Sequence, residues 1–123
     1  MNIKPNKSKN VQRSFGHAFN GVRHAMLHER NFKIHLAFGI LAAIFCIVFP
    51  VDVAHTFMVM YAIFFVLCME LINTAVEAII DLYCGKTLSP LAKIAKDCSA
   101  GAVLLGAIQA VLVGVVVLQH VFS

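Results

Sequence analysis

Charged residues are scarce in this chain. Only 10 Lys and Arg and 6 Asp and Glu occur among 123 residues (13%), whereas 60% of the residues are hydrophobic. A soluble domain of this size normally carries a far more charged surface, so the composition excludes that class. The mean hydropathy of +0.84 indicates a membrane protein instead.

Three motifs of other protein classes are also missing. The four cysteines form no C-x-x-C pair, which favours reduced thiols used in packing over a redox or metal motif. Gly85-Lys86-Thr87 resembles the end of a phosphate-binding P-loop, but Ile80 occupies the position of the first glycine and no strand precedes it. No cleavage site of small residues follows a short apolar core, so we expect no cleaved signal peptide.

Three apolar runs are long enough to cross a membrane, and the last of them contains no charged residue. At ~1.5 Å per residue, each run can span a hydrocarbon core about 30 Å thick. The sequence therefore predicts one all-α integral-membrane domain over residues 1–123. Its spans are expected at about 32–51, 54–80 and 98–121.

A further helix is expected before these spans, at about residues 11–30. Apolar side chains recur on one helical face of this segment: Val11, Phe15, Ala18, Val22 and Met26. An amphipathic helix of this kind lies flat on a membrane surface. Glu29 falls at the end of the apolar face, so its carboxylate should face the protein rather than water.

Four histidines share another helical face: His17, His24, His28 and His35. The steps of seven residues, from His17 to His24 and from His28 to His35, are too long for two ligands to share one ion, so we favour a hydrated face in the headgroup region over a metal site. His55 and His120 lie outside this segment, and the sequence assigns them no role.

Basic residues are concentrated in two segments. Seven of the ten precede Ile34, and the other three lie between the second and third runs. By the positive-inside rule, the N-terminus and residues 81–97 are cytoplasmic and the C-terminus is outside. The net charge of +4 fits anionic headgroups or a phosphate-bearing substrate, and it requires no nucleic acid.

A polar stripe interrupts the second apolar run. Glu70, Asn73, Glu77 and Asp81 are spaced i, i+3, i+7 and i+11. At about 100° per residue they fall within an arc of roughly 80°. Because burying a carboxylate in hydrocarbon costs about 3 kcal/mol or more, a helix with several on one face normally uses them for chemistry or ion transport.

Three interpretations of the stripe differ in class. Carboxylates and lysines at a cytoplasmic membrane face suit phosphoryl transfer to a lipid alcohol, because they can hold Mg²⁺, balance phosphate charge and accept a hydroxyl proton. A small proton or cation transporter would also use intramembrane acids, but no acid appears in the outer half of a span. Hydrogen bonding between helices explains Asn73 better than it explains Glu70 and Glu77.

The last span carries small residues on one face: Ala95, Ser99, Ala102 and Gly106. Small side chains allow helices to approach closely in a membrane. Ser89-Pro90 resembles an N-cap followed by proline at the first helical position, so this helix should begin in the cytoplasm, before its span.

Three strings in the polar segments carry a resemblance: Glu29-Arg30-Asn31-Phe32, the nine residues from Glu70 to Ala78 with Asp81, and Ala95-Lys96-Asp97. Together they resemble the prokaryotic diacylglycerol kinase and undecaprenol kinase family, over nearly the whole chain. The resemblance implies a small bacterial cytoplasmic-membrane kinase with a surface helix and three spans. It also implies a homotrimeric bundle with active sites shared between subunits, and ATP with Mg²⁺ as phosphoryl donor.

The resemblance implies roles for individual residues. Glu70 matches the catalytic base and is expected to meet the lipid. We also expect Ser99 to meet the lipid. Glu29 and Glu77 match ligands of the metal and the nucleotide. Lys96 and Asp97 match nucleotide contacts of the family. Asn73 and Asp81 match members of its polar cluster. We expect a neighbouring subunit to bring Glu29 and the stripe together.

The chain departs from the family pattern in two places. Residues 82–89 replace an acidic-Tyr-His segment that meets the nucleotide in many members, and Arg13 is the nearest candidate for an early basic position on the surface helix. Two strings, Glu-Arg-Asn-Phe-Lys and Pro-Leu-Ala-Lys-Ile-Ala-Lys-Asp, look most like members that phosphorylate undecaprenol. We therefore expect undecaprenol as the substrate, giving undecaprenyl phosphate, with diacylglycerol as the alternative.

Overall fold

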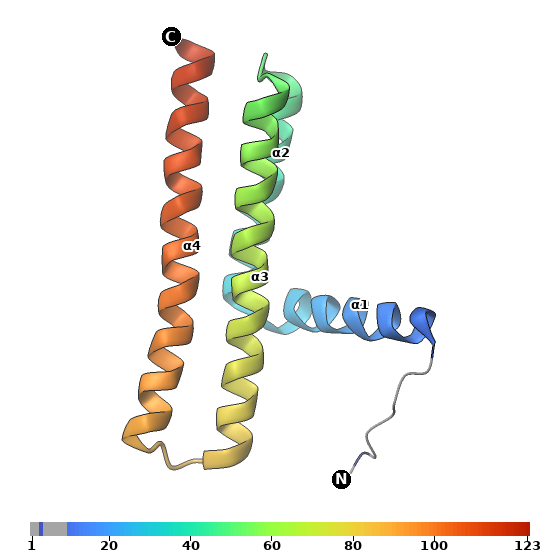
Figure 1. Ribbon diagram of the computed structural model, residues 1–123, viewed down its shortest axis with the longest axis vertical. Helices are drawn as coiled ribbons and strands as arrows, with labels where there is room; N and C mark the ends of the chain where they lie inside the picture. The colour runs from blue at the N-terminus through green and yellow to red at the C-terminus, as the bar shows by residue number, and fades with distance from the viewer. Residues whose placement is uncertain (1–2, 4–9) are drawn as a thin grey trace.

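The computed structural model describes Ile3 and residues 10–123, and all regular structure within them is helical. The helices are α1 (Val11–His28), α2 (Arg30–Val48), α3 (Val53–Cys84) and α4 (Pro90–Phe122). Figure 1 shows α2, α3 and α4 running in the same general direction, with α1 extending away from them to one side. Helix α3 is central, because it packs against each of the other three. The early basic residues Lys4, Lys7 and Lys9 lie outside the described residues.

Helices α2, α3 and α4 are each long and apolar enough to cross a membrane, which confirms the all-α class with three candidate spans. Helices α3 and α4 have 32 and 33 residues. At ~1.5 Å per residue they are about 50 Å long, well beyond a hydrocarbon core of about 30 Å. Their extra turns lie at the end where residues 85–89 connect them, which we call the loop end, and they extend past α1 (Figure 1).

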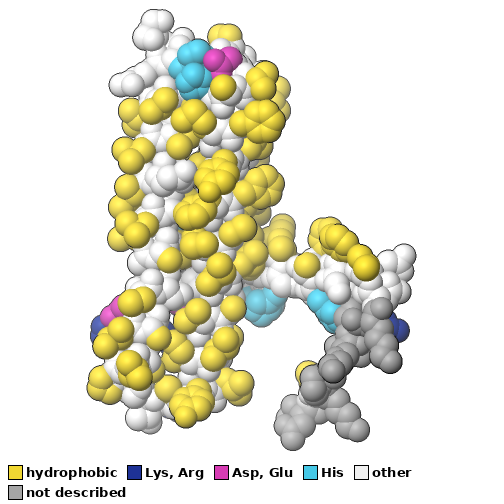
Figure 2. All heavy atoms as spheres, viewed as in Figure 1, with side chains coloured by type: hydrophobic (Ala, Val, Ile, Leu, Met, Phe, Trp, Pro, Cys, Tyr) yellow, Lys and Arg dark blue, Asp and Glu magenta, His cyan; other side chains and the backbone are white. Residues whose placement is uncertain are grey.

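Helix α1 has the expected amphipathic character. Figure 2 shows hydrophobic side chains along one side of this helix and histidines on the other side. The apolar residues Val11, Phe15 and Phe19 are all exposed, so no described residue of the chain covers them. Near the bundle, by contrast, Ala25 is completely buried. The helix is therefore anchored at its C-terminal end and free to lie along an apolar surface.

The chain turns sharply at Glu29, so α1 is shorter than the predicted 11–30. Glu29 has an extended backbone (φ −99°, ψ 111°) between the two helices, and its N–H donates to the Ala25 carbonyl at 2.9 Å. Ala25 and Phe32 are buried on the two sides of this corner. Because His35 belongs to α2, the predicted four-histidine face is not continuous, and its placement on a hydrated face was wrong for His35.

Helix α2 ends at Val48, three residues short of the predicted span, because the residue before a proline avoids helical backbone and Pro50 follows closely. Asp52 then caps α3, and its Oδ1 accepts the N–H of His55 at 2.8 Å. This hydrogen bond, with that from the His55 ring, lowers the pKa of Asp52 below its ordinary value. The carboxylate is therefore ionised at neutral pH.

The connection between α3 and α4 is shorter than predicted. Helix α3 continues to Cys84 rather than ending near residue 80, and Gly85 terminates it with a positive φ of 59°, a conformation that glycine adopts without a Cβ clash. Ser89 and Pro90 begin α4 as predicted, and the Ser89 Oγ accepts the N–H of Ala92 at 3.2 Å.

Helices α2 and α3 approach closely at Gly39, where we expect substitution to be costly. A Cβ at this position would lie 2.8 Å from the Cγ2 atom of Ile63, whose β-branched side chain has little freedom to move. Gly39→Ala should therefore destabilise the fold by about 1–3 kcal/mol and lower the midpoint of thermal unfolding in detergent. Gly101→Ala is the matched control, because nothing lies within 4 Å of its added Cβ. Equal midpoints for the two variants would contradict the close approach.

Candidate active site

The polar stripe of α3 passes from the bundle interior to its surface. Glu70 and Asn73 are only 2% and 8% exposed, Glu77 is half-buried, and Asp81 near the loop end is exposed. The buried members of the stripe lie on the side of α3 that faces the other helices. The stripe therefore joins a buried carboxylate to the solvent-facing end of the bundle.

Glu70 is the largest fully buried side chain in the described part of the protein. The Nε2 atom of His35, from α2, lies 3.3 Å from its Oε1. The two atoms are not aligned for a hydrogen bond, so this oxygen has no hydrogen-bond partner among the described residues. A buried polar atom without a partner costs about 1–3 kcal/mol, so it calls for an explanation such as a ligand.

Two further carboxylates lie near Glu70. The charges of Glu29 and Glu77 both act on it, Glu29 from the corner between α1 and α2 and Glu77 from two turns further along α3. A single chain thus brings the three predicted acids together. The turn at Glu29 directs the chain back towards α3, so Glu29 acts on the stripe of its own chain. The expected contribution of a neighbouring subunit stays a prediction.

Asn73 connects the stripe to α4. Its Oδ1 accepts a hydrogen bond from the Ser99 hydroxyl at 2.8 Å, and its Nδ2 donates to Glu77 Oε1 at 3.4 Å. The predicted small-residue face contributes here, since Ser99 and the buried Gly106 both lie against α3. These contacts fix the amide of Asn73 and one oxygen of Glu77 relative to Glu70.

Two ion pairs lie at the loop end. Lys96 of α4 is 2.6 Å from Asp81 of α3, and Lys93 is 2.5 Å from Asp97 one turn along the same helix. Asp81 and Asp97 are both exposed, whereas Lys96 is partly covered. Lys96 and Asp97, two of the residues predicted to meet a nucleotide, therefore lie where α3 and α4 extend past α1.

His35 is the site residue that sequence reasoning missed. It was grouped with the histidines of α1, because the break at Glu29 has no glycine or proline to announce it. A second signal was present, since His35 is the one titratable group in the apolar sequence from Ile34 to Phe45. A titratable side chain inside a span normally faces the bundle interior and marks a functional site.

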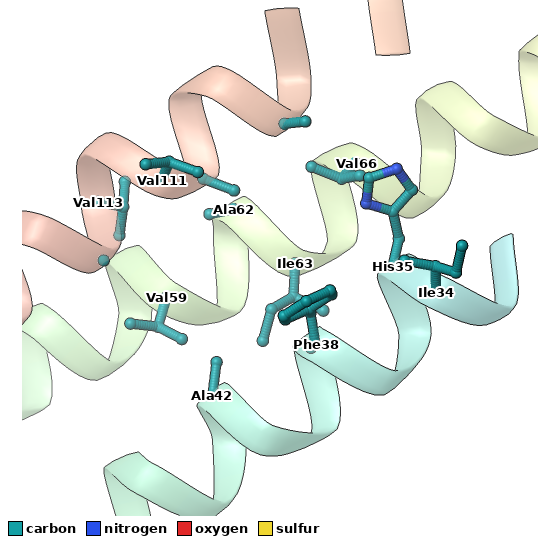
Figure 3. A pocket seen from close by; sticks show the side chains of 14 residues that line it. Ile34, His35, Phe38, Ala42, Val59, Ala62, Ile63, Val66, Val111 and Val113 are labelled. Carbon is teal, nitrogen blue, oxygen red and sulfur yellow. The ribbon is translucent and has the colours of Figure 1, made fainter. Parts of the chain in front are cut away.

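An apolar cavity of about 400 Å³ leads to His35 from the middle of the bundle. Residues of α2, α3 and α4 line it, including Phe38, Ala62, Val66 and Val111. In Figure 3 the His35 ring points towards Val66 at one end of this cavity. Val66 lies one turn before Glu70 on α3, so this end of the cavity is near the buried carboxylate, although Glu70 itself does not line it.

Comparison with known proteins decides the family. A family model described as prokaryotic diacylglycerol kinase matches residues 16–118. The chain belongs to this family. The recognition from sequence motifs is thereby confirmed, and so is the enzyme class, an ATP-dependent lipid kinase with transmembrane helices.

Curated relatives of the family carry two names. A diacylglycerol kinase of Synechocystis is 41% identical over 105 residues, which cover 85% of this chain and 60% of the relative. An undecaprenol kinase of Bacillus subtilis is 33% identical over 105 residues and 85% of both chains. A diacylglycerol kinase of Escherichia coli is 27% identical over 113 residues and 92% of both chains. The chain thus spans less than two thirds of the Synechocystis protein but most of the other two.

Proposed function

We propose that this protein transfers the γ-phosphate of ATP to diacylglycerol, giving phosphatidic acid. The sequence motifs favour undecaprenol, but the relative at 41% identity is named a diacylglycerol kinase and the one at 33% an undecaprenol kinase. We therefore place diacylglycerol first. Undecaprenol stays the second candidate, because the Bacillus relative matches over 85% of both chains.

The buried oxygen of Glu70 that has no hydrogen-bond partner among the described residues is the observation that carries this proposal. It lies in a buried carboxylate close to an apolar cavity, where a lipid hydroxyl could meet it. We propose that Glu70 takes the proton of this hydroxyl as its oxygen bonds to the γ-phosphorus. The bond from that phosphorus to the β,γ-bridging oxygen breaks, and ADP leaves. His35 beside Glu70 would orient the carboxylate, and Ser99 would lie on the lipid side.

The nucleotide is proposed to bind on the loop-end side of Glu70. Glu29 and Glu77 are half-buried carboxylates with the hard oxygen atoms that Mg²⁺ prefers, so the donor set fits this ion. Bound Mg²⁺ would neutralise charge on the phosphate oxygens. Lys96 would meet phosphate as a compact cation, and Asp97 would accept hydrogen bonds from the nucleotide. Asn73 and Asp81 would hold Glu77 and Lys96 in position.

This arrangement implies an orientation in the bacterial cytoplasmic membrane. We propose that α1 lies on the cytoplasmic surface, that the loop end extends into the cytoplasm, and that the C-terminus is outside. The basic residues of α1 and of the loop end support this topology. ATP then reaches Glu77 from water, while the lipid reaches Glu70 from the bilayer.

We also propose a homotrimer. Three spans form a slender bundle in which few side chains are buried, and α2 packs against α3 without closing the cavity towards α4. A neighbouring subunit would cover these surfaces, and its α1 would lie over a site other than its own.

The direct test supplies purified protein with Mg-ATP and each lipid in turn. We expect labelled phosphate in diacylglycerol at a higher kcat/KM than in undecaprenol. The reverse order would restore undecaprenol as the substrate. Transfer to neither lipid would contradict the proposed kinase reaction, and cation flux into liposomes without ATP would favour the transporter instead.

A further inference from the structure

A second cluster of polar side chains lies at the end of the bundle opposite the loop end. Asp52 precedes α3, His55 lies in the first turn of α3, and His120 lies in the last turn of α4. Figure 2 shows acidic and histidine side chains in contact at this end of the molecule, far from α1. None of the three takes part in the proposed kinase reaction.

The three side chains are close together. Asp52 Oδ1 lies 2.6 Å from His55 Nδ1, and Asp52 Oδ2 lies 3.6 Å from His120 Nε2. The two imidazole rings stack with centroids 4.0 Å apart and planes 12° apart. One donor atom from each residue can be chosen so that all three lie within 4.8 Å of one another.

We propose that Asp52, His55 and His120 bind a first-row transition-metal cation such as Zn²⁺. Two imidazole nitrogens and one carboxylate oxygen are a common ligand set for Zn²⁺, with bonds of about 2.0–2.2 Å and water in the fourth position. Tetrahedral geometry at that bond length separates the donor atoms by about 3.3 Å, so the distances between the donor atoms need to change by at most about 1.5 Å. The side chains are 22–51% exposed and can make this rotation.

The surroundings favour a cation of this class over an ordinary salt bridge. In the described part of the chain, Asp52 forms its ion pairs with the two histidines and with no Lys or Arg. The His55 and His120 rings both approach the same carboxylate. Imidazole ligands also select transition metals over Mg²⁺, which prefers oxygen.

A bound ion would connect segments that are distant in the sequence. Asp52 directly precedes α3, and His120 lies in the last turn of α4. The other ends of these two helices are joined by the short connection at residues 85–89. The ion would therefore hold together the one end of this helix pair that the chain leaves unlinked. The expected consequence is a more stable fold, with no change in the chemistry at Glu70.

The test is a Zn²⁺ titration of the detergent-solubilised full chain by calorimetry, with excess Mg²⁺ present to occupy oxygen-only sites. We expect one ion per chain and a rise in the midpoint of thermal unfolding that a chelator reverses. His120→Gln and His55→Gln should each weaken binding by at least ~10–100-fold, since even loss of a supporting residue around a metal has that effect. Kinase activity without Zn²⁺ should be unchanged in His120→Gln.

His24→Gln is the matched control. His24 and His28 form another close histidine pair, with ring centroids 4.7 Å apart, but without an ion pair to a carboxylate among the described residues. This variant should keep the wild-type affinity and the Zn²⁺-dependent rise in the unfolding midpoint. If His120→Gln and His24→Gln bind Zn²⁺ equally well, or if neither wild-type binding nor stabilisation is seen, the proposed site does not exist.

Discussion

Glu70→Gln should lower kcat by about 10²–10⁴-fold, the usual contribution of a general base, while nucleotide binding is retained. Glutamine keeps the size of the buried side chain but cannot accept the hydroxyl proton. Glu70 and Glu77 are seven residues apart, or ~10 Å along α3, so a change at one need not disturb ligands at the other. Steady-state kinetics with Mg-ATP, together with direct titration of the nucleotide, would measure both quantities.

Glu77→Gln is the comparison that separates the two roles. Glu77 is half-buried on the loop-end side of Glu70, where we place Mg-ATP. Its loss should raise KM for Mg-ATP, and additional Mg²⁺ should restore part of the activity. Asp52→Asn, at the opposite end of the bundle, should leave both parameters unchanged. If Glu70→Gln and Glu77→Gln lose nucleotide binding to the same extent, the division of roles between the two acids is wrong.

The sequence predicted the helices and the polar stripe because both follow from periodicity. Apolar runs that match the thickness of a bilayer identify the spans, and the spacing from Glu70 to Asp81 places one face of α3. The N-cap at Ser89 with Pro90 was equally local, and it correctly began α4. Such features depend on neighbouring residues and need no knowledge of tertiary contacts.

Other features depend on packing and could not be read in the same way. The turn at Glu29 is held by burial of Ala25 and Phe32, and no glycine or proline marks it. This turn separates His35 from the histidines of α1 and places it beside Glu70. It also brings Glu29 to the stripe within one chain, which changes what a neighbouring subunit would have to supply.

That change leads to a prediction about mixed oligomers. Arg13 precedes Glu29 by 16 residues, or about 24 Å along an α-helix, and α1 points away from its own bundle (Figure 1). If a basic residue of α1 serves the site, as the family pattern suggests, it must serve the site of a neighbouring subunit. Arg13→Ala should then be nearly inactive alone but should recover activity when co-assembled with Glu70→Gln.

The symmetry of a trimer sets the size of this recovery. In any mixed ring of three, one Arg13→Ala subunit has a Glu70→Gln neighbour on the required side, so roughly one third of wild-type activity is expected. Purification through a different affinity tag on each variant would isolate the mixed oligomers for assay. Glu29→Gln with Glu70→Gln is the matched pair that should stay inactive, because each chain supplies both of these residues to its own site. Recovery in this second pair alone would show instead that Glu29 crosses to the neighbouring subunit, since no single chain in that mixture contains both acids.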